Sequence, residues 1–86
     1  MGKRRNFRKE ATERIGFLKD RVKERALAIR GSSDTYGDPE DRLSVSYDIW
    51  NECFYYYVKG QQVKLPAFIK ACADSDREYM AANPEG

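Results

Sequence analysis

Apolar residues in the first third of the chain recur with the period of a helix. They are Phe7, Ala11, Ile15, Leu18, Val22, Ala26 and Ile29. At about 100° per residue these positions fall on one stripe, while charged residues occupy the rest of the surface. The pattern predicts a helix from Asn6 to Arg30, ended by Gly31, because glycine readily adopts the left-handed conformation found after helix ends.

The middle of the chain combines a polar loop with a second apolar pattern. After the loop at residues 31–38, Asp38 and Pro39 form a helix-start signal, since aspartate caps helices and proline fits the first turn. Apolar residues then step by three or four positions through Leu43, Tyr47, Trp50, Phe54 and Tyr57. The run at residues 54–58 also has strand propensity. Its continuity with the helical stripe favours a helix to Lys59, ended by Gly60.

A third helix is expected to start at Pro66. Its apolar side contains Phe68, Ile69, Cys72 and then Tyr79 or Met80, and Asp76 falls close to that stripe. The predicted fold class is therefore all-α: one small three-helix domain over residues 1–86, with a long basic first helix. Residues 1–6 are expected to form a basic, disordered arm, and residues 81–86 a frayed tail.

Composition narrows the class of protein. A chain of 86 residues with 41% hydrophobic and 35% charged residues lies near the lower size limit for an independent core, so a homodimer or a partner would supply further stability. No window is apolar enough to span a membrane, which predicts a cytoplasmic protein.

The absence of histidine removes the commonest general acid/base and nearly every zinc site. Cys53 and Cys72 are expected to be small core residues, and whether they pair stays open.

Charge is distributed unevenly along the chain. Residues 1–30 carry eleven Lys/Arg against four Asp/Glu, a net of +7, whereas residues 31–86 carry five against ten, a net of −5. A basic arm of this kind is a candidate nucleic-acid surface through counterion release. The residues assigned to that alternative are Lys3, Arg4, Arg5, Arg8, Lys9 and Arg14. The four acidic residues in the same stretch weaken this interpretation and favour a solubilising helix with a disordered, charged end.

The most distinctive segment is the loop from Arg30 to Glu40. It is rich in hydroxyl and amide groups and opens onto a predicted helix start, a geometry that suits anions such as phosphate. The two acidic residues at that start fit plain capping and would suit a phosphate only with a bridging metal. The candidate ligand-binding residues are Arg30, Thr35, Tyr36, Asp38 and Glu40.

The same loop carries a partial family resemblance. The segment Thr35–Glu40, preceded by Arg30 and followed by Trp50 and Lys70, resembles small helical domains of phages and bacteria that are akin to MazG-like and nucleotide-modification-associated domains. The resemblance covers residues 22–72. MazG-type enzymes use two pairs of acidic residues with Mg²⁺; here Glu10 and Glu13 match the first pair, and nothing matches the second. The resemblance therefore implies a shortened, non-catalytic member.

Together these observations predict a phage-type accessory protein that binds a nucleotide or a host protein through the Arg30–Glu40 loop region. Neither a catalytic residue nor a metal ligand is assigned, and no cofactor is expected. Two alternatives stay open: a nucleic-acid-binding protein that uses the basic arm and first helix, and a truncated MazG-like nucleotide pyrophosphohydrolase that would require Mg²⁺. The other acidic residues are expected to solvate the helix surfaces.

Overall fold

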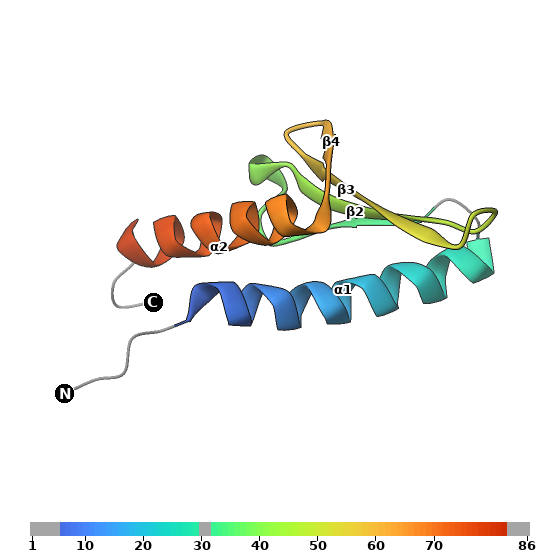
Figure 1. The fold of residues 1–86 in the computed structure, drawn as a ribbon, viewed down its shortest axis with the longest axis horizontal. Coiled ribbons are helices and arrows are strands. Elements are labelled where there is room, and N and C mark those ends of the chain that lie inside the picture. The colour runs from blue at the N-terminus through green and yellow to red at the C-terminus, as the bar shows by residue number, and fades with distance from the viewer. Residues whose placement is uncertain (1–5, 30–31, 83–86) are drawn as a thin grey trace.

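The computed structural model describes residues 6–29 and 32–82 and has an α+β fold (Figure 1). Two helices pack against one side of a four-stranded antiparallel sheet with strand order β1-β2-β3-β4. The elements in chain order are α1 (Phe7–Ile29), β1 (Ser33–Thr35), the 3-10 helix η1 (Pro39–Asp41), β2 (Leu43–Asp48), β3 (Cys53–Val58), β4 (Gln61–Val63) and α2 (Leu65–Ala82). The prediction of an all-α, three-helix bundle is wrong, because residues 43–63 form strands.

Helix α1 confirms the first prediction almost to the residue. Asn6 precedes it and caps it, since the Lys9 backbone N–H donates to the Asn6 side-chain oxygen at 3.0 Å. Five residues of the predicted stripe are buried: Ala11, Ile15, Leu18, Val22 and Ala26. Ile29, at the end of the stripe, is 68% exposed. The apolar period therefore predicted the helix and most of its buried face.

The predicted second helix is instead the β2–β3 hairpin. Leu43, Val45 and Tyr47 are all buried, and the residues between them are half-buried, as expected for a strand with one face on the core. In β3 the run of aromatic and β-branched residues pairs with β2 over its full length, from Cys53 opposite Asp48 to Val58 opposite Leu43. The strand propensity of this run outweighed the helical spacing, because side chains of this kind pack well on a pleated surface.

The turn between β2 and β3 is organised by Asp48. Its carboxylate accepts hydrogen bonds from the Trp50 backbone at 2.8 Å and from the Asn51 backbone and side chain at 3.2 and 2.7 Å. The bonds from Asn51, followed by the one from Trp50, lower the pKa of Asp48. This aspartate-centred turn ends the strand where a helix was expected to continue. Trp50, predicted to face inward, lies in the turn and is 78% exposed.

Gly60 was predicted to end a helix. It instead completes the turn between β3 and β4. Lys59 and Gly60 have φ values of 52° and 83°, and the flanking Val58 and Gln61 are paired, which is the pattern of a type I′ hairpin turn. A Cβ at Gly60 would lie 3.0 Å from the Arg42 guanidinium.

Gly60→Ala is expected to lower the free energy of unfolding by about 1–2 kcal/mol, because alanine is strained at this φ. Urea denaturation measures the change. The matched control is Gly16→Ala, where the backbone is helical and nothing lies within 4 Å of the added Cβ. That change is expected to raise stability by up to about 1 kcal/mol. A neutral result at Gly60 would contradict the assigned turn.

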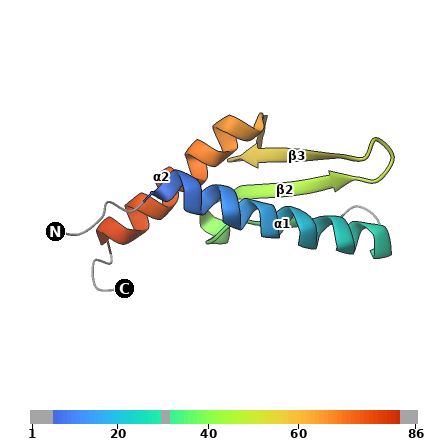
Figure 2. The same ribbon diagram turned by 60° about the horizontal axis from the view of Figure 1, so that its bottom comes forward.

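Both helices lie on the same side of the sheet, and the core sits between them and its inner face (Figures 1 and 2). Helix α2 begins at Leu65, one residue before the predicted start, and buries Phe68, Cys72 and Ala73. Phe68 packs on Tyr56 of β3 with ring centroids 5.3 Å apart. Cys72 is therefore a core residue as predicted; Cys53 is half-buried at the start of β3, and both thiols are free.

Candidate functional site

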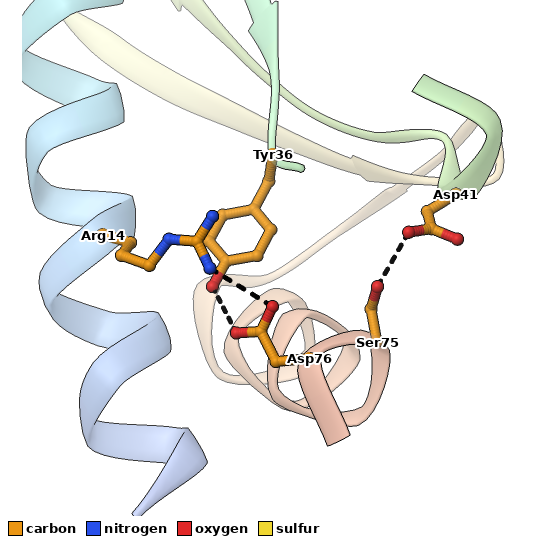
Figure 3. A network of polar contacts seen from close by, with 5 residues as sticks. All are labelled: Arg14, Tyr36, Asp41, Ser75 and Asp76. Atoms are coloured by element: carbon orange, nitrogen blue, oxygen red, sulfur yellow. Dashed lines mark hydrogen bonds and ion pairs between the residues drawn. The ribbon is translucent and has the colours of Figure 1, made fainter. Parts of the chain in front are cut away.

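Tyr36 connects the loop after β1 to both helices. Only 4% of the residue is exposed, and its backbone N–H donates to the Leu43 carbonyl at 2.7 Å, which extends the pairing of β1 with β2. Its hydroxyl donates to Asp76 of α2 at 2.7 Å, and the Arg14 guanidinium of α1 lies 4.6 Å from the centre of its ring (Figure 3). Arg14 also bonds to Asp76 at 3.3 Å. We call Arg14, Tyr36 and Asp76 the Tyr36 clamp, because they join three separate segments.

The charges of the clamp favour a protonated tyrosine. Burial raises the pKa of Tyr36 well above its ordinary value, and the hydrogen bond to Asp76 and the charge of that carboxylate raise it further. The Arg14 guanidinium opposes this change only in part. The Tyr36 hydroxyl is therefore a fixed hydrogen-bond donor, and its first role is structural.

A second group of charges lies beside the clamp, at β1. The Oδ2 atom of Asp34 lies 3.0 Å from the guanidinium groups of both Arg21 and Arg25 of α1 and forms an ion pair with each. Its Oδ1 atom accepts a hydrogen bond from the Thr35 backbone N–H at 2.8 Å. Three guanidinium groups on this side of α1 thus share two carboxylates, Asp34 and Asp76. The side chains of Arg14 and Arg21 are 55% and 61% exposed, so both reach solvent. This edge of the molecule has an excess of positive charge.

A cleft of about 210 Å³ lies between α1 and the loop after β1. We call it the Arg14–Arg21 cleft. The lining residues are Arg14, Phe17, Leu18, Arg21, Thr35, Tyr36 and Gly37. Arg14 and Arg21 are seven residues apart and thus lie about two turns apart on one side of the helix. The cleft is smaller than the 300 Å³ or so that is usual for a pocket enclosing a drug-sized ligand. Its size and charge suit a single anionic group, with the rest of a ligand outside.

Some of the predicted ligand-binding residues line the cleft, and others lie elsewhere. Thr35 and Tyr36 line the cleft, together with Arg14, which the sequence had assigned to nucleic acid. Asp38 caps η1, as its carboxylate accepts the Glu40 N–H at 2.9 Å. The predicted cap is confirmed, although the helix it starts has only three residues. Glu40 is exposed and does not line the cleft, and Arg30 lies outside the described residues.

Sequence reasoning missed Arg21, Arg25 and Asp34 as members of this site. One signal was present: Arg14, Arg21 and Arg25 are separated by seven and four residues, which places them on one side of a helix. The position of Asp34 opposite them depends on how β1 packs against α1, and no local pattern reports it. Asp76, noted for its nearness to the apolar stripe of α2, is the acceptor of the clamp.

Of the residues of the nucleic-acid alternative, the structure describes Arg8, Lys9 and Arg14. Lys3, Arg4 and Arg5 lie outside the described residues, and Arg8 and Lys9 are exposed in the first turns of α1. Arg8 borders a small groove with Lys70 and Arg77, both of which are paired with Asp74, at 3.3 and 2.7 Å. Within residues 6–29 and 32–82, no group of three or more His, Cys, Asp or Glu side chains is arranged to hold a metal ion.

The chain matches no family model, and no curated protein or solved structure is significantly similar to it. The resemblance to MazG-like domains therefore stays a prediction. Among the described residues, no helix is long and apolar enough to cross a membrane.

Proposed function

We propose that this protein is a small binding protein that recognises a phosphate-bearing ligand, with a nucleotide as the first candidate. Arg14 and Arg21 would hold the phosphate in the Arg14–Arg21 cleft. The observation that carries the proposal is that two guanidinium groups and no carboxylate line a cleft of one anion's size, while Arg14 and Arg21 are paired with Asp76 and Asp34 outside that lining.

The chemistry of the lining residues supports this assignment. A guanidinium has several N–H donors in a planar fork that matches the oxygens of a phosphate. Arg21 competes with Arg25 for one oxygen of Asp34, so an incoming anion finds a donor whose charge is only partly compensated. Phe17 is 76% exposed and borders the same cleft, which places an apolar surface where a base or other flat group would lie.

Arg21→Ala is expected to weaken binding of the ligand by roughly 10- to 100-fold, the effect of losing a charge-assisted hydrogen bond. Isothermal titration with inorganic phosphate, and with nucleoside mono- and triphosphates with and without Mg²⁺, measures the change. The matched control is Arg25→Ala, because Arg25 shares the same carboxylate but does not line the cleft. Equal binding by Arg21→Ala and the unaltered protein would contradict the proposal.

The same variants distinguish phosphate binding in the cleft from the nucleic-acid alternative. Binding of short DNA or RNA that falls steeply with salt, survives Arg21→Ala and is lost in Arg8→Ala/Lys9→Ala would move the function to the basic first turns of α1. Binding of a host protein without any response to phosphate compounds would equally overturn the phosphate assignment.

A further inference from the structure

The outer face of α1 carries a regular row of exposed residues, one of which, Lys23, also places its ammonium 5.7 Å from the centre of the Tyr47 ring. Its members are Lys9, Glu13, Gly16, Asp20, Lys23 and Leu27, which step by four, three, four, three and four positions. All six are exposed, and they lie opposite the buried stripe of the helix. Figure 2 shows α1 along the outside of the molecule, with no other element over it. This alternating spacing is the one used by helices that pack side by side over several turns.

The surface along this row has the shape and apolar content of a contact. A groove of about 660 Å³ is lined by Glu13, Gly16, Phe17, Lys19, Asp20, Lys23 and Phe54. Phe17 and Leu27 are 76% and 68% exposed. At Gly16 nothing lies within 4 Å of an added Cβ, so the isolated chain has no steric need for glycine there. A glycine on an exposed helix face weakens the helix but lets a second helix approach closely.

The order of charges on the row is self-complementary. When an identical helix is laid antiparallel with its centre at the level of Leu18, Glu13 faces Lys23 of the second copy and Gly16 faces its Asp20. Lys9 faces Leu27, whose side chain the lysine stem can cover. In this register the Glu13–Lys23 ion pair occurs twice by symmetry. Phe17 flanks the row near its centre, so the two Phe17 rings meet across the two-fold axis.

We propose that this face of α1 is the interface of an antiparallel homodimer, in which the α1 helices of two copies pack along the Lys9–Leu27 row. A second copy is the occupant that the observations favour, because Glu13 and Lys23 face each other at both symmetric positions of an antiparallel pair, as a two-fold interface requires. An unrelated helix has no reason to reproduce that charge order. The interface borders the Arg14–Arg21 cleft through Phe17, which lines both surfaces, but neither arginine belongs to the row.

Charge reversal tests the proposal with variants that retain the fold. Glu13→Lys places like charges opposite Lys23 at two symmetric sites, and Lys23→Glu does the same opposite Glu13. Each single variant is expected to dimerise roughly 10-fold more weakly than the unaltered protein. An equimolar mixture of the two variants is expected to regain the dimer, because every lysine of one chain then faces a glutamate of the other. Sedimentation equilibrium over a range of protein concentrations measures all three.

Gly16→Gln supplies an independent check. Glutamine favours the helix over glycine, so the thermal midpoint of the chain is expected to rise at low protein concentration, while its bulk separates the helices and abolishes the dimer. A monomeric protein at every concentration would overturn the proposal. So would a mixture of Glu13→Lys and Lys23→Glu chains that fails to associate better than either alone, because another register or another occupant would not couple these two positions.

Discussion

Tyr36→Ala is expected to lower the free energy of unfolding by about 3–5 kcal/mol, the usual cost of truncating a buried aromatic side chain. Tyr36 is 4% exposed, and its ring lies against the Arg14 guanidinium while its hydroxyl bonds to Asp76. The truncation removes the ring and frees two charged partners from the clamp. Because the total stability of a domain is only about 5–15 kcal/mol, and a chain this short is expected near the lower end, this loss removes a large part of the stability of the fold.

Tyr36→Phe is the control that separates the ring from the hydroxyl. It keeps the apolar contacts and removes one hydrogen bond, so the expected loss is about 1–1.5 kcal/mol. Asp76 retains Arg14 as a partner at 3.3 Å. Chemical denaturation followed by circular dichroism measures both variants. Similar, small losses in the two would show that the ring is not buried as described. Ligand-binding tests should accordingly use Tyr36→Phe, because Tyr36→Ala would confuse unfolding with lost contacts.

Cys72 is expected to resist alkylation in the folded protein by about three orders of magnitude relative to the unfolded chain. Its pKa is raised from 9.0 to about 12, mainly by burial and then by the nearby Asp76 carboxylate, while the charge of Arg14 opposes the change. Since the thiolate is the reacting form, a pKa three units higher lowers its population at pH 8 by roughly 1,000-fold. Labelling of Cys53→Ser, which leaves Cys72 as the single thiol, measures this directly. Rapid labelling under native conditions would contradict the packing of α2.

The same pKa change predicts a weakening of the fold at alkaline pH. The folded state holds the Cys72 proton to a pKa of about 12, whereas the unfolded chain loses it near 9.0. Above that lower value the unfolded state binds fewer protons, so stability falls by about 1.4 kcal/mol per pH unit until the folded thiol also titrates. Below pH 9 this group leaves stability unchanged. Cys72→Ala should reduce the slope of unfolding free energy against pH between 9 and 12, and an unchanged slope would count against the buried thiol.

The sequence predicts α1 well because a single period runs through it. Five of its predicted stripe residues are buried, and its start coincides with the Asn6 cap. Residues 43–58 were misassigned because two periods coexist there. Leu43 and Tyr47 belong both to the helical series with Trp50 and to the alternating series with Val45, and only the second is realised. The aromatic and β-branched run in β3 favours the alternating series over the helical one.

The candidate site could be predicted only in part, for a different reason. Thr35 and Tyr36 were identified from an unusual local segment, whereas Asp76 was noted beside an apolar stripe without being assigned a role. The contribution of Arg21 depends on which side of α1 faces β1, and pairing between residues distant in sequence sets that orientation. Local propensity contains no such information.

The most direct test of the proposed function is a titration of the isotope-labelled protein with inorganic phosphate, followed by nucleoside triphosphate, recorded in two-dimensional amide and arginine side-chain NMR spectra. We expect the backbone amide signals of Thr35 and Gly37 to shift saturably with ligand concentration. The side-chain signals of Arg14 and Arg21 are expected to shift with them, while the side-chain signal of Arg77 on α2 does not change. Shifts confined to the first turns of α1, or no saturable change near the Arg14–Arg21 cleft, would contradict the account.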